Sequence, residues 1–180
     1  MTAETIEATQ DQETQTTATP DDMAVRIARN EALVRKHAIG AVAIGLIPLP
    51  GVDFVALTVL QLNLLRKLST EYGVPFTEDI GKKAVGSLVA GYTPVALAMP
   101  IASLLKIVPV LGQALGGLAM SAVSGASTYA VGKVFVQHFE SGGTFLNFDP
   151  VAVREYYRAQ FQKGQEIVKE AKSEAAPIAV

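Results

Sequence analysis

Three long stretches with almost no charged residues dominate the middle of this chain. Between Ala38 and Leu65 the only Asp, Glu, Lys, Arg or His is Asp53. The stretches Ala84–Leu105 and Ile107–Gly132 contain none at all. A helix crosses the hydrocarbon core of a bilayer with about 20 apolar residues, and the second and third stretches reach that length. The pattern predicts an all-α protein with membrane-embedded helices.

Composition favours the same class and excludes several others. Charged residues make up 18% of the 180 residues, below the ~25% of an ordinary soluble domain. The absence of cysteine excludes disulfides and thiolate metal sites. A net charge of −2 without a dense basic cluster argues against nucleic acid as a partner.

The two ends of the chain are polar. Residues 1–20 form an acidic arm without Lys or Arg, which we expect to be disordered and which lacks the features of a secretory signal. Pro20 and the aspartates after it predict a helix start, and residues 21–145 are expected to form the helical membrane domain. Asp149 and Pro150 predict the start of an amphipathic C-terminal helix within residues 146–174, followed by a tail at 175–180.

Proline and glycine divide the apolar region. Two prolines and a glycine interrupt the first stretch, and Pro109 to Gly112 repeat the arrangement in weaker form. Proline cannot donate a backbone hydrogen bond, so each site predicts a break between two helices of a hairpin. Further along, Gly73 is expected to end a helix and Thr77 to cap the next. The predicted break residues are Pro48, Pro50, Gly51, Asp53, Pro109 and Gly112.

The first break allows two geometries. Ala38–Ile47 and Val52–Leu65 extend only about 15 and 21 Å as helices, so neither arm spans a bilayer. A tight turn would make a wedge that enters and leaves on one face, whereas a kink would make a single span. We prefer the wedge, because basic residues flank both arms and favour the cytoplasmic face. The predicted cytoplasmic flanks are Arg35, Lys36, Arg66, Lys67, Lys82, Lys83 and Lys133.

Small residues recur at four-residue spacing through the third stretch, where they allow helix backbones to approach closely. They predict either a face for self-association or a pore wall, or packing within the chain against Ala84–Leu105, and we favour packing within the chain. The residues are Gly112, Gly116, Gly117, Ser121, Gly125, Thr128 and Gly132.

No motif indicates catalysis, a metal or a cofactor. Gly132–Lys133 lacks the remaining residues of a phosphate-binding loop. His37 and His138 are far apart in sequence and are expected at surface or interfacial positions. Asp53 is expected in the first turn of a helix, where a carboxylate is stabilised by the helix dipole, although an ionisable group at membrane depth is often functional.

The motifs taken together resemble a known family. The Ile47 to Asp53 break, the Tyr72 to Phe76 connector, the Pro109 to Gly112 turn, and the segments Gly125–Ala130 and Ser141–Thr144 are similar to the bacterial YcjF-type domain family of unknown function. The resemblance covers Ala38 to Thr144. That family occurs alone in membranes and after Era-like GTPase domains, which implies a membrane module that works with a GTPase.

Three functions are consistent with these observations. The first is a non-enzymatic membrane module that binds lipid, self-associates, and scaffolds or shapes a bacterial inner or intracytoplasmic membrane assembly, with cytoplasmic termini and a possible GTPase partner. The second is a channel or carrier in which broken helices and Asp53 line a polar path. The third is a soluble all-helical partner domain of a GTPase.

Overall fold

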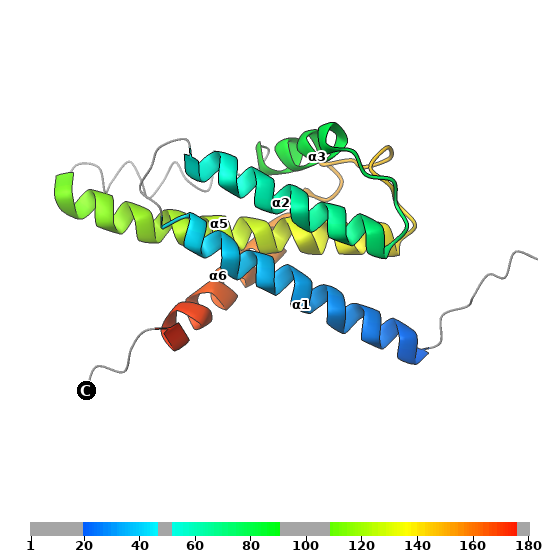
Figure 1. The fold of residues 1–180 in the computed structure, drawn as a ribbon, viewed down its shortest axis with the longest axis horizontal. Helices are drawn as coiled ribbons and strands as arrows, with labels where there is room; N and C mark the ends of the chain where they lie inside the picture. The colour runs from blue at the N-terminus through cyan, green and yellow to red at the C-terminus, as the bar shows by residue number, and fades with distance from the viewer. Residues whose placement is uncertain (1–19, 47–51, 91–108, 176–180) are drawn as a thin grey trace, which may run out of the picture.

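The computed structural model describes residues 20–46, 52–90 and 109–175, with side chains from 21–46, 55–90 and 120–174. Throughout these ranges the regular elements are helices, which confirms the all-α fold. They are α1 (Pro20–Ile44), α2 (Val52–Glu71), α3 (Glu78–Ala90), α5 (Pro109–Glu140) and α6 (Arg154–Ala175) (Figure 1). The predicted break at Pro48, Pro50 and Gly51 lies outside the described residues.

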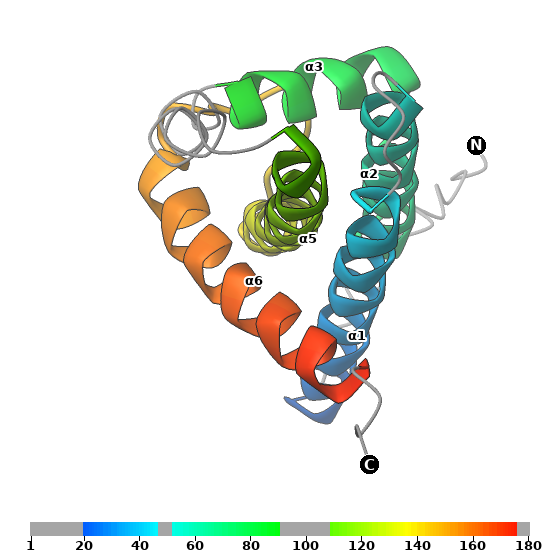
Figure 2. The same cartoon turned by 90° about the vertical axis from the view of Figure 1, so that its left-hand side faces the viewer.

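Helix α5 is the central element of the bundle. In the end-on view α6, α3 and the α1–α2 pair surround it (Figure 2). The most extensive contacts of α5 are with α1 and α6, and α2 and α3 also touch it. A helix that is apolar on all sides must be covered on all sides, and α5 carries no charge before Lys133. Most of its residues from Ser121 to Val136 are buried within the chain.

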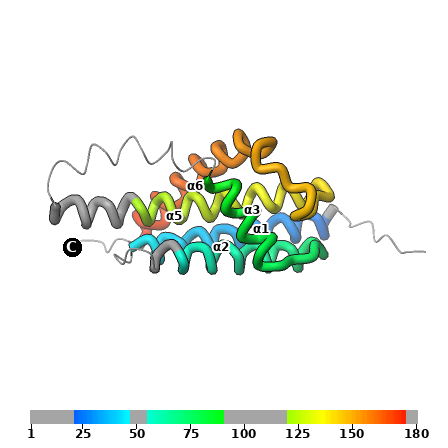
Figure 3. The backbone as a smooth tube through the Cα atoms, turned by 90° about the horizontal axis from the view of Figure 1, so that it is seen from above, coloured from blue at the N-terminus to red at the C-terminus, as the bar shows by residue number. Residues whose placement is uncertain are grey.

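The first two helices form an antiparallel hairpin. Arg29 of α1 pairs with Glu71 of α2, and Gly40 of α1 approaches Leu60 of α2. Residue numbers therefore increase along α1 in the direction in which they decrease along α2. Figure 3 shows the two helices side by side. In the described residues α1 and α2 are therefore two antiparallel helices and not one kinked helix.

Glycines set the distance between α5 and its neighbours. A Cβ placed on Gly125 would lie 2.6 Å from the Val168 side chain and 2.7 Å from that of Val42. A Cβ on Gly132 would lie 2.7 Å from Val34. Because real Cβ atoms do not come this close, α1 and α6 pack against α5 at a separation that larger residues would prevent.

Helix α6 covers α5 with one apolar face. Tyr157, Phe161, Gly164 and Val168 are buried at helical spacing. The expected start at Asp149–Pro150 is wrong, since α6 begins at Arg154. The Asp149 carboxylate instead accepts a hydrogen bond from the Val151 amide at 2.8 Å and stabilises a turn before the helix. The C-terminal helix therefore belongs to the same core as the preceding helices.

An aromatic cluster closes the end of the bundle where α5 finishes. Phe135 stacks on Phe148 with ring centroids 4.6 Å apart, and Phe139 meets Phe145 edge-on at 5.2 Å. Phe76, from the connector before α3, joins them through Phe145. The cluster fixes the α2–α3 and α5–α6 connections against each other.

Two helices end at glycines, as expected for Gly73. Gly73 and Gly142 adopt φ values of 64° and 77°. The Val74 amide donates to the Ser69 carbonyl at 2.8 Å, and the Gly143 amide donates to that of His138 at 2.9 Å. These are Schellman closures, which require a left-handed residue and so favour glycine. At the other predicted ends, α1 begins at Pro20, and Thr77 Oγ1 accepts a bond from the Ile80 amide at the start of α3.

Within the described ranges, no helix combines the length and apolarity needed to cross a bilayer.

The close approach of α6 to α5 can be tested at Gly164. A Cβ at this position would lie 2.9 Å from the Ala126 Cα, a backbone atom that cannot rotate away. We expect Gly164→Ala to lower the free energy of unfolding by about 1–3 kcal/mol, the usual effect of overpacking. The measurement is chemical denaturation followed by circular dichroism.

The matched control is Gly86→Ala at an exposed position of α3, where a Cβ meets nothing within 4 Å. This variant should raise stability by up to about 1 kcal/mol, because alanine favours the helix more than glycine does. Equal stability of the two variants would contradict tight packing at Gly164.

Candidate functional site

The turn end of the α1–α2 hairpin exposes apolar side chains. Gly45, which directly follows α1, approaches Ser121 of α5, and Gly40 of α1 approaches Leu60 of α2. The C-terminal end of α1 therefore lies level with the part of α5 near Ser121 and with the first half of α2. Large apolar side chains remain exposed at this level on all three helices. They are Ile39 (47% exposed), Leu46 (49%), Val55 (62%), Val59 (61%) and Met120 (37%). Several of them grouped at one end indicate a binding surface more strongly than scattered single residues do.

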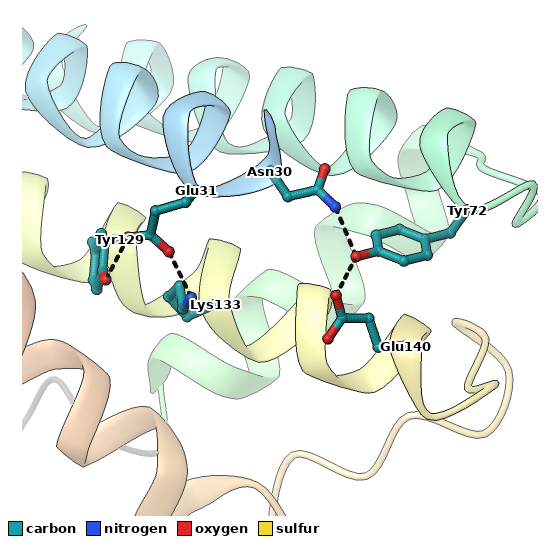
Figure 4. A network of polar contacts seen from close by, with 6 residues as sticks. All are labelled: Asn30, Glu31, Tyr72, Tyr129, Lys133 and Glu140. Atoms are coloured by element: carbon teal, nitrogen blue, oxygen red, sulfur yellow. Dashed lines mark hydrogen bonds and ion pairs between the residues drawn. The ribbon is translucent and has the colours of Figure 1, made fainter. Parts of the chain in front are cut away.

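The opposite half of the hairpin is tied to α5 by a polar seam, defined as Asn30, Glu31, Tyr72, Tyr129, Lys133 and Glu140 (Figure 4). In its first part, Lys133 Nζ donates to Glu31 Oε2 at 2.6 Å and the Tyr129 hydroxyl donates to Glu31 Oε1 at 3.0 Å. Both carboxylate oxygens of Glu31 are therefore used, and α1 is held in register with α5.

The second part of the seam joins three helices through Tyr72. Asn30 Nδ2 donates to the Tyr72 hydroxyl at 2.7 Å, and that hydroxyl donates to Glu140 Oε1 at 2.9 Å. The Arg26 guanidinium lies 5.5 Å from the centre of the Tyr72 ring. The seam thus connects α1, the end of α2 and the end of α5.

Electrostatics in the seam follow from burial and pairing. Burial alone would raise the pKa of Glu31, but Lys133 and the Tyr129 hydroxyl outweigh it and hold this pKa below its usual value of 4.5. Burial, followed by hydrogen bonding to carboxylates, raises the pKa values of Tyr72 and Tyr129. The seam is therefore built from an ionised Glu31 and neutral tyrosines at pH 7.

The sequence did not predict this seam, apart from Lys133. Asn30, Glu31 and Tyr72 fall outside any motif, because their partners are distant in the chain. Lys133 was predicted as a cytoplasmic basic flank, and its side chain is 21% exposed and turned toward Glu31. The sequence offered one signal for this pair: a lysine that follows a long uncharged stretch of helix needs an anionic partner if its side chain is buried. The other six predicted flanks, Arg35, Lys36, Arg66, Lys67, Lys82 and Lys83, are exposed.

The predicted small-residue face lies inside the chain wherever it is described. Ser121, Gly125, Thr128 and Gly132 are all buried. Gly125 lies against α1 and α6, and Gly132 lies against α1 and α2. Most of the expected partner stretch, Ala84–Leu105, lies outside the described residues. The surroundings of Gly112, Gly116 and Gly117 lie outside the described side chains.

The predicted break residues are only partly described. Val52 begins α2, which places Asp53 in the first turn as expected, although its side chain lies outside the description. The second break differs from its prediction. Pro109 is the first residue of α5, where proline is well tolerated, so Gly112 lies inside the helix and not in a turn before it.

The histidines differ from expectation in part. His37 was expected at a surface or interface but is 7% exposed. Its Nδ1 lies 2.8 Å from the Leu33 carbonyl oxygen, which requires a proton on Nδ1, and its Nε2 is 3.2 Å from the Asn63 side-chain oxygen. His138 lies against Phe148 with ring centroids 5.2 Å apart. Among described residues, no group of acidic, histidine or cysteine side chains could hold a metal ion.

Comparison with known proteins gives two findings. The profile of a family described as "Domain of unknown function (DUF697)" matches residues 9–166. The chain is also 36% identical over 151 residues to "Magnetosome membrane protein 22" of Magnetospirillum gryphiswaldense, covering 83% of this chain and 77% of that protein. No solved structure gives a significant match.

The polar seam predicts acid sensitivity through Glu31. Because the folded-state pKa lies below the unfolded value, the pair stabilises the protein above pH 4.5 and loses this effect as pH falls through the lowered pKa. We expect the unfolding free energy of Glu31→Gln to fall less than that of wild type between pH 6 and pH 3. The measurement is urea denaturation at each pH.

The control is Glu155→Gln, whose side chain is 78% exposed and pairs only at the surface with Arg158. Its acid sensitivity should follow that of wild type. If Glu31→Gln also follows wild type, Glu31 does not contribute a stabilising ion pair.

Proposed function

The chain belongs to the DUF697 family, and from that premise we propose that it is a non-enzymatic, membrane-associated scaffold protein of a bacterial membrane. The observation that carries the proposal is its similarity to a magnetosome membrane protein along most of the length of both chains. The uncharged stretches of the sequence and the exposed apolar end of the α1–α2 hairpin support it.

The hairpin end supplies a physical basis for membrane association. Exposed isoleucine, leucine and valine side chains gain free energy on leaving water, by ~25 cal/mol for each Å² buried. In the proposed arrangement this end enters the apolar part of the bilayer. The seam holds the other half of the hairpin against α5, so the apolar end is presented by a rigid bundle. An intracytoplasmic membrane is the proposed location, with the termini on the cytoplasmic side.

Self-association and a GTPase partner are finer parts of the proposal. Because the described small residues of α5 are buried, Gly112, Gly116 and Gly117 are the remaining candidates of that series for contact between copies. The GTPase partner follows from the resemblance of Ala38 to Thr144 to a GTPase-linked family. Native mass spectrometry of the purified protein tests the first part, and nucleotide-dependent co-purification of an Era-like GTPase tests the second.

Membrane association by the hairpin end predicts the effect of added charge. The double variant Ile39→Lys with Leu46→Lys replaces two half-exposed apolar side chains, one in α1 and one just after it. We expect its partition coefficient onto phosphatidylcholine vesicles to fall at least about tenfold, from the loss of apolar burial alone. Flotation of protein with vesicles measures the partition.

The control places the same charges at the other end of the bundle, with Leu146→Lys and Val151→Lys, at residues 87% and 65% exposed. This variant should float like wild type. If wild-type protein does not float with any vesicle, the proposed function is wrong, and equal losses in both variants would contradict the assignment of the binding surface.

A further inference from the structure

A groove between α2 and α3 has two chemically different ends. It encloses about 460 Å³, within the ~300–1,000 Å³ of typical ligand pockets. Val55, Val59 and Leu62 of α2 line the end nearer the hairpin turn. Asn63 and Arg66 of α2, with Glu78 and Lys82 of α3, line the other end.

The charged end carries more positive than negative charge. Arg66 Nη2 lies 3.2 Å from Glu78 Oε1, and Lys82 Nζ lies 3.6 Å from Glu78 Oε2, so one carboxylate draws two cations together. The side chains are 56%, 53% and 59% exposed for Arg66, Lys82 and Glu78. Ion pairs this exposed contribute little in water, so their rearrangement costs little free energy. Arg66 and Lys82 can therefore turn toward a second anion. The Arg66 guanidinium also lies 5.6 Å from the Phe76 ring centre, which restricts its position.

A second hollow continues the groove between the same helices. It encloses about 360 Å³ and shares Thr58 and Lys82 with the first. Leu57, Val85 and Val89 line it, and it reaches Ser127 of α5. Two apolar channels thus meet beside one cationic end.

We propose that this groove binds one anionic phospholipid, with its phosphate between Arg66 and Lys82 and its acyl chains along the two hollows. Arginine recognises phosphate through paired N–H donors, and lysine adds a second positive charge. The valine and leucine side chains of the groove provide an apolar surface for the acyl chains.

The length of the groove matches one leaflet. Val55 and Arg66 are separated by about 16 Å along α2 at helical rise. The acyl region of one leaflet is half of the ~30 Å hydrocarbon core. With the hairpin end toward the bilayer, the apolar end of the groove at Val55 faces the membrane, and Arg66 lies farther from it along α2. The inference rests on the proposed membrane association, because the lipid reaches the groove from the bilayer.

The absence of tryptophan from the chain allows a specific probe. Val59→Trp places one tryptophan at a groove position whose native side chain is 61% exposed. Two vesicle sets have the same proportions of phosphatidylglycerol and phosphatidylcholine, and bromine is carried on the acyl chains of one lipid or the other at equal mole fraction. Since surface charge is identical in both sets, the difference in fluorescence quenching reports which lipid occupies the groove.

We expect quenching at position 59 to be at least about threefold stronger when bromine is on phosphatidylglycerol, given the attraction of two basic side chains for an anionic lipid. Adding Arg66→Gln and Lys82→Gln should make the two sets quench equally. Both replaced side chains are more than half exposed, so the fold should be retained, as circular dichroism would verify.

The matched control adds Lys67→Gln and Lys83→Gln instead. These exposed lysines adjoin Arg66 and Lys82 in sequence and do not line the first hollow, yet their removal lowers the net charge equally. The phosphatidylglycerol preference should persist in this control. Its loss in both double variants would indicate diffuse surface attraction and would overturn the groove assignment.

The remaining outcomes separate this inference from the proposed function. Equal quenching by both vesicle sets in the parent Val59→Trp protein overturns the lipid site and leaves membrane association intact. Absence of quenching by either set, together with absence of flotation, overturns both. A tryptophan signal in lipid-free protein that changes with protein concentration would assign the groove to a second copy of the chain and overturn the lipid site.

Discussion

The enclosure of α5 from Ser121 to Val136 is the constraint on which the rest of the bundle depends. Up to Gly132 this part of the helix is uncharged, so its faces must be covered, and α1, α2, α3 and α6 all touch α5. Glycines make the coverage close, since a side chain at Gly125, Gly132 or Gly164 would meet a neighbouring helix at 2.9 Å or less. The antiparallel helices α1 and α2 both pack against α5 and against each other.

Polar and apolar contacts divide the hairpin along its length. Near its open end, Glu31 and Tyr72 join α1, α2 and α5 through directional hydrogen bonds. Near its turn, Ile39, Val55 and Val59 are exposed, and Met23, Val25 and Ile27 are exposed at the start of α1 as well. A directional network fixes register, whereas exposed apolar surface favours a nonpolar environment.

Helix content and several helix ends were predictable from the sequence because they depend on neighbouring residues. Pro20, Gly73 and Thr77 act within one turn of helix, and the structure places helix ends at all three. The start of α6 was missed because the turn that precedes it, held by the Asp149 carboxylate, competes locally with helix. The burial of His37 and the inward orientation of Lys133 were missed because each depends on a partner in a distant helix.

The sequence by itself determined that this chain is helical, with an uncharged centre that must avoid water. It could not determine what covers that centre, because a helix that is apolar on all sides can be covered by lipid or by other helices. The tertiary structure decided this for Ser121 to Val136 by surrounding α5 with the other helices of the chain. It also brought together the polar seam and the α2–α3 groove, since both depend on helix register, which is set by the packing of whole faces.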